Sequence, residues 1–330
     1  MTLPILLLTD PIDSDVCASL KQKFFVQLAS STEAEALRRE AKAASFIVVR
    51  AHLPQDLFEH TPRLRGVVRH GAGLDMIPVE AASRHGVAVA NVPAVNAGSV
   101  AEYAVAQMLA LARHLPGIGA TLQAGAWTQA RKMADDATDL QGKTVAIVGM
   151  GAIGQALARI CALGFGMRVL GIRRNATPDH DQVHYVALPE GLRQADYLVL
   201  ACPLTDETLG LIGSDQLAIM KPTACLVNVA RGPVVDELAL ATALRTGALA
   251  GAALDVFTTQ PLPASSALLG LPNVLLSPHL AGITRESMRR MSEGVASQLL
   301  EMLDGRLPRH FVNRQAQEAI LARWSTLSQT

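Results

Sequence analysis

The chain has 330 residues, which is the size of about two average domains and is long enough to bury large hydrophobic cores. Lys and Arg total 29 and Asp and Glu total 29, so no net charge attracts the chain to nucleic acid or to an anionic membrane. We therefore expect neither as a partner. The hydrophobic fraction of 50% and the charged fraction of 18% exclude a disordered chain and suit aliphatic strands covered by helices.

The cysteines are widely spaced and form no CxxC pair; they are Cys17, Cys161, Cys202 and Cys225. Neither a disulfide framework nor a metal site is therefore predicted. The apolar N-terminal run lacks a preceding basic segment and leads directly to Asp10, which favours a buried strand over a signal peptide. No run reaches the ~18 consecutive apolar residues of a membrane span. We expect a cytoplasmic protein without a metal.

Strand-length apolar runs alternate with helix-length amphipathic segments, the pattern of parallel sheets built from βαβ units. The first series of predicted strands covers residues 5–8, 46–49, 66–69 and 87–90. The second series is more uniformly apolar, as a sheet covered on both faces requires. It covers residues 144–148, 168–172, 197–201, 225–229, 251–254 and 274–277.

Two long helices are predicted between and after these series. Ser99 and Glu102 have the spacing of a capping box, which predicts a helix from Ser99 to about Leu115. Another amphipathic segment runs from Thr284 to near Gly305. The first sheet is incomplete without this segment, so the C-terminal part of the chain is assigned to the N-terminal domain. The two helices would then bridge two lobes with a cleft between them.

A glycine-rich turn follows the predicted strand at 144–148, where residues 145–154 read VAIVGMGAIG. In G-x-G-x-x-G, Gly149 permits a tight turn, Gly151 lets the backbone approach a pyrophosphate and Gly154 allows close helix packing. The acidic residue that usually binds the adenosine ribose is replaced by Arg173 and Arg174. This pair suits a 2′-phosphate and predicts NADP over NAD. Alternatively, both arginines are ordinary surface charges and the protein does not discriminate.

Special residues follow each later strand: CPLT at 202–205, NVARG at 228–232, LDVF at 254–257 and SPHLAG at 277–282. In an open α/β sheet, ligands bind beyond the carboxyl ends of the strands, so these groups should face one site. Together with SVAE at 99–102, these strings resemble the D-isomer-specific 2-hydroxyacid dehydrogenase family over essentially the whole chain. The resemblance implies reversible hydride transfer between a nicotinamide and C2 of a 2-oxo or D-2-hydroxy acid.

The fold class that follows is α/β, with a Rossmann-type doubly wound parallel sheet plus a smaller flavodoxin-like domain. The dinucleotide-binding domain is expected over residues 98–284, and a discontinuous substrate-binding domain over 1–97 and 285–330. Family members are usually dimers, and Trp127 lies in the segment that often meets the partner subunit. The resemblance therefore implies a homodimer.

By the same resemblance, Arg231 matches the arginine that binds the substrate carboxylate and polarises its carbonyl, a task suited to a planar guanidinium. His279 matches the general acid and base. Alternatively, Arg231 caps a turn and His279 is a strand-end histidine that binds backbone. Asp255 resembles the residue that faces the nicotinamide carboxamide. Cofactor contacts are expected from Gly149, Gly151, Ala152, Ile153, Gly154, Arg173, Arg174, Cys202, Pro203, Thr205, Ala230, Asp255 and Gly282.

One catalytic position departs from the family pattern, because Gln260 replaces the glutamate that precedes the proline after LDVF. An amide can hydrogen-bond the imidazole but cannot stabilise its positive charge, so carbonyl reduction should shift toward acidic pH. The related formate dehydrogenases carry glutamine here, so formate-dehydrogenase-like oxidation is an alternative. A catalytically weak dinucleotide-sensing scaffold is another, since corepressors of this superfamily retain the fold.

The loop formed by Arg69, His70, Gly71, Ala72 and Gly73 matches the family's substrate loop. The backbone N–H groups of such a turn can bind a carboxylate. Arg50 and Arg69 end neighbouring predicted strands and resemble arginines of the phosphoglycerate dehydrogenases, which predicts a substrate with a second anionic group. The alternative is simple surface exposure of either arginine.

Overall fold

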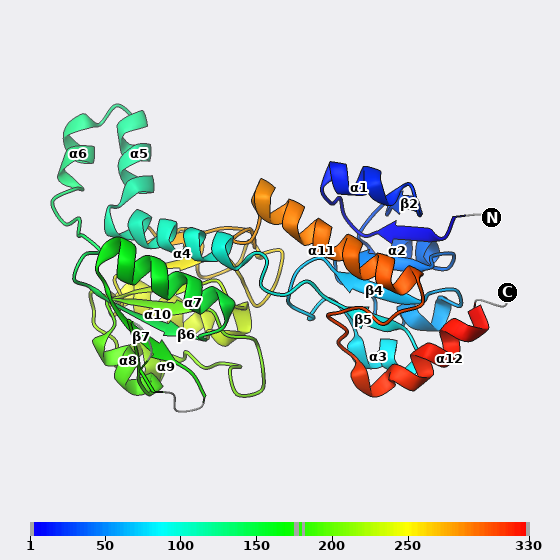
Figure 1. Ribbon diagram of the computed structural model, residues 1–330. Coiled ribbons are helices and arrows are strands. Elements are labelled where there is room, and N and C mark those ends of the chain that lie inside the picture. Colours follow the sequence, from blue (N-terminus) through cyan, green and yellow to red (C-terminus); the bar gives the residue numbers. More distant parts are fainter. Residues whose placement is uncertain (1–2, 175–177, 180–181, 328–330) are drawn as a thin grey trace. The chain divides into compact units, whose positions relative to one another are not determined.

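The computed structural model describes residues 3–174, 178–179 and 182–327 (Figure 1). The chain divides into two compact units, each with a parallel sheet and its own hydrophobic cores. Unit 1 comprises Met1–Asn96 and Ile283–Thr330, and unit 2 comprises Ala97–Gly282. The C-terminal segment thus belongs with the N-terminal one.

Unit 1 is built on a five-stranded parallel sheet of order β2-β1-β3-β4-β5, which is the flavodoxin-like order. Its strands are β1 (Ile5–Leu8), β2 (Phe25–Leu28), β3 (Phe46–Val49), β4 (Gly66–Arg69) and β5 (Ala88–Ala90). Its helices are α1 (Ser14–Leu20), α2 (Ala34–Ala41), η1 (Leu57–His60), α3 (Val79–Arg84), α11 (Arg285–Leu303), η4 (Arg314–Ala316) and α12 (Gln317–Leu327).

Successive residues of a strand face opposite sides of the sheet, and each side of the unit 1 sheet has its own cover of helices. Leu6 and Leu8 of β1 pack in one cluster with residues of α1, α11 and α12. Leu7, between them, packs in the other cluster with residues of α2, η1 and α3. The C-terminal helices therefore supply part of the cover that buries one face of this sheet.

Unit 2 is built on a seven-stranded parallel sheet of order β12-β11-β10-β9-β6-β7-β8, the doubly wound Rossmann order that reverses between β6 and β9. Its strands are β6 (Thr144–Val148), β7 (Arg168–Ile172), β8 (Val183–Tyr185), β9 (Tyr197–Leu200), β10 (Cys225–Asn228), β11 (Gly251–Leu254) and β12 (Val274–Leu276). Its longer helices are α4 (Ala97–Ala112), α5 (Leu115–Gln123), α7 (Ala152–Arg159) and α10 (Glu237–Thr246). The shorter ones are α6 (Trp127–Lys132), η2 (Ile160–Gly164), α8 (Leu188–Gln194), α9 (Ser214–Ala218) and η3 (Gly232–Val234).

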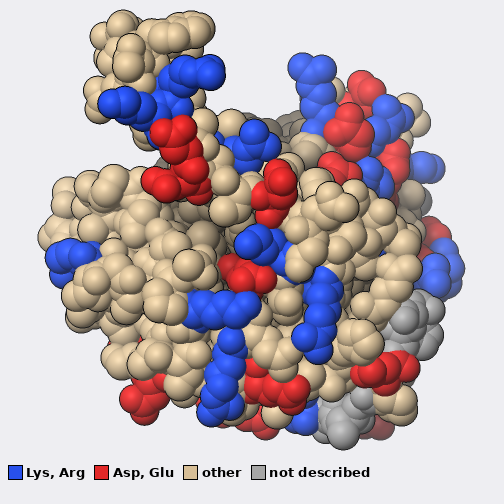
Figure 2. Space-filling model, turned by 90° about the vertical axis from the view of Figure 1, so that its left-hand side faces the viewer, with Lys and Arg blue, Asp and Glu red and all other residues tan. Residues whose placement is uncertain are grey.

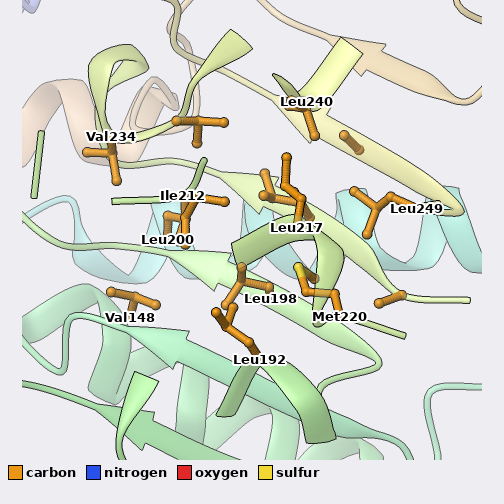
Figure 3. Packing of buried hydrophobic residues seen from close by; sticks show 14 of the residues in the cluster. Val148, Leu192, Leu198, Leu200, Ile212, Leu217, Met220, Val234, Leu240 and Leu249 are labelled. Atoms are coloured by element: carbon orange, nitrogen blue, oxygen red, sulfur yellow. The ribbon is translucent and has the colours of Figure 1, made fainter. Parts of the chain in front are cut away.

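Both faces of the unit 2 sheet are buried. Figure 3 shows one side, where Leu192 of α8, Leu217 of α9 and Leu240 of α10 belong to one cluster with Leu198 and Leu200 of β9. The other face is covered by α4 and α7. Two-sided burial explains why these strands are nearly continuous apolar runs. The predicted combination of a Rossmann-type sheet and a flavodoxin-like domain is confirmed.

Two strands were missing from the sequence prediction, namely β2 and β8. Both lie at the edge of their sheet, and none of their residues is fully buried. Their short apolar stretches are interrupted, by Gln27 in β2 (FVQL) and by His184 in β8 (VHY).

The predicted start of the long helix at Ser99 is wrong. Helix α4 begins at Ala97, which places Ser99 inside its first turn rather than at the N-cap. The helix also ends at Ala112, and His114 then adopts a left-handed conformation with φ 52° before α5 begins. Pro116 fits the first turn of α5, where a missing N–H breaks no helical hydrogen bond.

Figure 2 shows Lys and Arg interspersed with Asp and Glu on one face, with no broad region of one sign. Among the helices that the structure describes, none is long and apolar enough to cross a membrane. The described residues also contain no cluster of three or more His, Cys, Asp or Glu side chains able to hold a metal ion.

Candidate active site

A cavity of about 610 Å³ adjoins the glycine-rich turn after β6 and the loop after β9, where the strand order reverses. Seven predicted cofactor residues line it: Gly149, Gly151, Arg173, Arg174, Cys202, Pro203 and Thr205. Ala152, Ile153 and Gly154 form the first turn of α7. Ala230, Asp255 and Gly282 lie elsewhere, after β10, β11 and β12 respectively.

The glycine-rich turn is shaped for close backbone approach. Gly149 has φ 97°, and a Cβ there would lie 2.6 Å from the backbone nitrogen of Cys202. A Cβ on Gly154 would lie 2.1 Å from the Gly149 carbonyl oxygen, so neither position tolerates a side chain. Gly151 differs, because a Cβ there would meet no atom of the described residues within 4 Å. The space beside Gly151 is therefore open to a ligand.

Helix α7 begins directly after Gly151, and no side chain of the described residues caps it. The N–H groups of its first turn and the positive end of the helix dipole can therefore bind an anion. Together with the open space at Gly151, this turn fits the pyrophosphate of a dinucleotide.

The two arginines after β7 both have partners within the protein. Arg174 forms an ion pair of 2.6 Å with Glu207, and Arg173 lies over the ring of Tyr185 at 5.9 Å from its centroid. Glu207 lies in the loop after β9 and lines the same cavity as the two arginines. Glu207 was not predicted from the sequence, because nothing near it in the chain indicates that it pairs with Arg174.

The turn that carries Arg231 is organised by Asn228 at the end of β10. The Asn228 side chain accepts a hydrogen bond from the Ala230 N–H at 3.0 Å and donates one to the Arg231 carbonyl at 3.0 Å. The half-buried Arg231 guanidinium donates to the Ala230 carbonyl at 2.7 Å. Gly232 packs so tightly that a Cβ there would lie 1.9 Å from the Phe257 carbonyl carbon. The Arg231 turn therefore rests on the segment after β11.

The turn that carries His279 is organised by Asp255 at the end of β11. Asp255 is 2% exposed, and its carboxylate accepts hydrogen bonds from the N–H groups of Leu280 at 2.9 Å and Ala281 at 2.8 Å. The Asp255 carbonyl accepts from the His279 N–H at 2.8 Å. These bonds fix the backbone at His279, whose φ of 56° is unusual for a residue other than glycine. Asp255, expected to face a nicotinamide carboxamide, thus holds the histidine turn.

The structure brings Gln260 and His279 together. The Gln260 Oε1 lies 3.4 Å from the His279 Nδ1, and the Gln260 Nε2 donates to the Phe257 carbonyl at 3.3 Å. That second bond fixes which end of the amide faces the imidazole. An Nδ1–H of His279 can then donate to the amide oxygen, which leaves Nε2 for a substrate. Both side chains border a largely apolar cavity of about 540 Å³, together with Leu262, Leu269 and Leu276.

In unit 1, the Arg69 side chain is hydrogen-bonded to the backbone of the predicted substrate loop. Its guanidinium donates to the carbonyls of Gly73 at 3.1 Å, Val49 at 3.0 Å and His70 at 2.7 Å. Arg50 forms an ion pair with Asp10 at 3.2 Å. Both predicted substrate arginines therefore bind groups of unit 1 itself.

The other side chains of this loop differ in exposure. His70 is 3% exposed, and its Nε2 lies 2.9 Å from the Ser292 Oγ on α11. Burial, assisted by the positive charges of nearby arginines, lowers the pKa of His70 to about 3. The ring is neutral at physiological pH and faces α11. Gly71 has φ 138°, and the exposed Ala72 offers backbone at the loop surface.

The chain is similar to known proteins in both sequence and structure. The family model described as "D-isomer specific 2-hydroxyacid dehydrogenase, NAD binding domain" matches residues 105–281. The chain is 42% identical to glyoxylate reductase of Korarchaeum cryptofilum over 264 residues, 79% of each protein. It is 36% identical to glyoxylate/hydroxypyruvate reductase B of Pectobacterium carotovorum over 315 residues, 94% of this chain and 98% of that protein.

A solved structure is similar to this chain over nearly its whole length. It is the NADPH-dependent glyoxylate/hydroxypyruvate reductase of Sinorhizobium meliloti in complex with NADP and malonate, with a TM-score of 0.82 and 31% identity. The match covers 94% of this chain and 97% of that one. Because the family model spans more than half of the sequence, the chain belongs to the D-isomer-specific 2-hydroxyacid dehydrogenase family and is an NAD(P)-dependent oxidoreductase of 2-hydroxy and 2-oxo acids.

Proposed function

We propose that this enzyme reduces a small 2-oxo acid, with glyoxylate and hydroxypyruvate as the first candidates, that Arg231 and His279 act on the substrate, and that Gln260 acts through His279. One observation carries the proposal. Asn228 and Asp255, at the ends of adjacent strands, fix the turns of Arg231 and His279, and Gln260 contacts the histidine. The relatives support the substrate class, since they are named as reductases of these acids.

The chemistry divides among these side chains. A nicotinamide, when bound, supplies or accepts the hydride at C2 of the substrate. Arg231 binds the carboxylate through its planar guanidinium and stabilises negative charge on the carbonyl oxygen. His279 donates a proton to that oxygen during reduction and removes it during oxidation. Gln260 orients the imidazole without adding charge.

We propose that the loop at 71–73 contributes backbone N–H groups to carboxylate binding, with Arg69 as its internal brace. The contacts of Arg69 with three loop and strand carbonyls support this assignment. A second anionic group on the substrate would have to compete with the bonds that Arg50 and Arg69 already make. Phosphohydroxypyruvate tests that part of the proposal directly.

A substrate screen tests the function. Glyoxylate, hydroxypyruvate, phosphohydroxypyruvate, sulfopyruvate and oxaloacetate are assayed for NADPH and NADH oxidation from about pH 5 to 8, the range in which histidine titrates. Formate is assayed for reduction of both oxidised cofactors. We expect turnover with glyoxylate or hydroxypyruvate. Formate oxidation alone, or tight cofactor binding without turnover of any acid, would contradict the proposal.

Replacing Gln260 with glutamate is expected to extend carbonyl reduction to higher pH by about one unit. A carboxylate in place of the amide oxygen, 3.4 Å from the His279 Nδ1, stabilises the imidazolium, so the general acid keeps its proton at higher pH. The measurement is the pH dependence of kcat for the preferred 2-oxo acid. Gln22→Glu adds the same charge at an exposed site of unit 1 and serves as control. An unchanged profile in Gln260→Glu would refute this role of Gln260.

We propose that the enzyme prefers NADP, and that Glu207 moderates this preference. A 2′-phosphate that binds Arg174 must displace the Glu207 carboxylate, which also repels it. Glu207→Gln is therefore expected to tighten NADPH binding about fivefold and leave NADH binding unchanged, as suits an exposed ion pair. Nicotinamide fluorescence gives both dissociation constants. Asp206→Asn is the matched control, since Asp206 does not line the cavity. Equal changes for both cofactors would rule out this role.

We further propose a homodimer in a reducing, cytoplasmic compartment. Helices α5 and α6 form a hairpin that projects from the body of unit 2 (Figure 1). Apolar side chains are exposed on it, with Leu115 at 55%, Leu122 at 44% and Trp127 at 69%. An apolar projection of this kind favours burial against a second subunit. Light scattering measures the mass in solution and so tests the homodimer.

All four cysteines are free thiols, which suits the reducing compartment.

A further inference from the structure

We propose that Tyr103 and Ser277 are positioning residues for hydride transfer, because they hold Asp255 and, through it, the turn that presents His279. The inference rests on the proposed function, since it takes His279 as the group that transfers the proton. Neither residue touches the reacting atoms in this assignment. They influence the position of His279 through the buried carboxylate of Asp255.

The three side chains form a chain of hydrogen bonds from α4 to the end of β11. The Ser277 Oγ donates to the Asp255 Oδ1 at 2.7 Å, and the Tyr103 Oη is hydrogen-bonded to the same Ser277 Oγ. A serine hydroxyl has a single proton, and here that proton points to the carboxylate. Tyr103 is therefore the donor to Ser277. Burial raises the pKa of Tyr103, so the phenol keeps its proton at physiological pH.

The Asp255 carboxylate depends on these donors. Its Oδ1 accepts from Ser277 and from the Leu280 N–H, and its Oδ2 accepts from the Ala281 N–H. A carboxylate that is 2% exposed is stable as an anion only when such donors replace water. Without the Ser277 hydroxyl, Oδ1 would hold one backbone donor from the histidine turn and lose its side-chain donor.

The strained backbone of His279 makes the hydrogen bonds that hold Asp255 important. A non-glycine residue at φ 56° persists when the surrounding structure fixes it. Here the fixing bonds converge on Asp255, which binds the backbone on both sides of the imidazole. A carboxylate that can rotate or shift would let the turn relax. The imidazole would then leave its place beside Gln260, and proton transfer would slow while cofactor binding stayed intact.

A matched pair of substitutions at Ser277 tests the inference. Valine and threonine have nearly the same shape, but only threonine keeps the hydroxyl that donates to Asp255. We expect Ser277→Val to lower kcat for the preferred 2-oxo acid about 30-fold, and Ser277→Thr to stay within about threefold of the wild type. The NADPH dissociation constant should not change in either variant. Equal kcat values for the two variants would overturn the inference.

Tyr103→Phe provides the second arm and decides the question if Ser277→Val does not fold by circular dichroism. We expect kcat to fall about fivefold with an unchanged KM, because a polarising donor to Ser277 is lost. The double variant Tyr103→Phe/Ser277→Val should be no slower than Ser277→Val, since Tyr103 acts through Ser277. Fully additive losses, or an unchanged kcat in Tyr103→Phe, would contradict the proposed chain.

Tyr197→Phe is the control for the loss of a buried phenol. Tyr197 is 4% exposed and lies at the start of β9, the opposite end of the parallel strands from the Asp255 turn. We expect its removal to leave kcat and KM unchanged. A wild-type enzyme that turns over no 2-oxo acid would remove the proposed function itself. An active wild type that needs His279 but is insensitive to Tyr103 and Ser277 would remove only the positioning role.

Discussion

Replacing His279 with asparagine is expected to lower kcat for 2-oxo acid reduction by about 10²- to 10⁴-fold, the usual contribution of a general acid. Asparagine tolerates the left-handed backbone better than most residues, so the φ of 56° does not by itself destabilise the variant. It can retain a polar contact with Gln260 but cannot transfer the proton. The NADPH dissociation constant should stay unchanged, because the glycine-rich turn lies on other strands of the sheet.

His114→Asn is the matched control for this variant. His114 is also a histidine in the left-handed conformation, with φ 52°, and it lies at the start of α5 rather than beyond a strand end. We expect kcat to be unaffected there. If His279→Asn kept more than about a tenth of the wild-type kcat, His279 would not be the general acid.

Replacing Arg231 with methionine is expected to lower kcat/KM by about 10³-fold, because both the carboxylate contact and the positive charge near the developing oxyanion are lost. Methionine keeps an unbranched stem, so the change in side-chain shape near the backbone is small. Arg231→Lys keeps the charge but not the planar fork, and a loss of about 10²-fold is expected. Steady-state kinetics with the preferred 2-oxo acid measure both losses.

Arg245→Lys, at the exposed end of α10, controls for a general effect of this exchange. It should leave kcat/KM unchanged. An Arg231→Lys enzyme with wild-type kcat/KM would show that bidentate carboxylate binding is not the role of Arg231. A parallel loss of NADPH affinity would instead indicate a disturbed Rossmann sheet.

The parts of the fold that the sequence predicts are those where burial imposes a pattern. The strands of the unit 2 sheet between its two edges are apolar because helices cover both faces, so they could be identified along the chain. The edge strands β2 and β8 are interrupted by the polar residues Gln27 and His184 and were missed. The start of α4 was misplaced because a Ser-x-x-Glu string inside a helix looks the same as one at its N-cap.

The candidate site also contains residues that the sequence predicts and residues that it does not. Arg231 and His279 could be selected from sequence because each follows a strand and matches a family string. Glu207, Tyr103 and Ser277 could not, because their contacts depend on loops or helices distant in the sequence. A residue type also says little about its partners. The sequence identified Arg69 as a candidate cation for a ligand, whereas its guanidinium donates to three backbone carbonyls.

The contact between Gly232 and the backbone of Phe257 has a consequence for how this enzyme can diversify. The turn that carries Arg231 and the segment that carries Gln260 abut with no room for even a methyl group on Gly232. Neither can be remodelled alone, because any shift of one displaces the other. A substitution at this junction is therefore expected to disturb both turns at once, so changes of substrate preference are expected from substitutions at other surfaces.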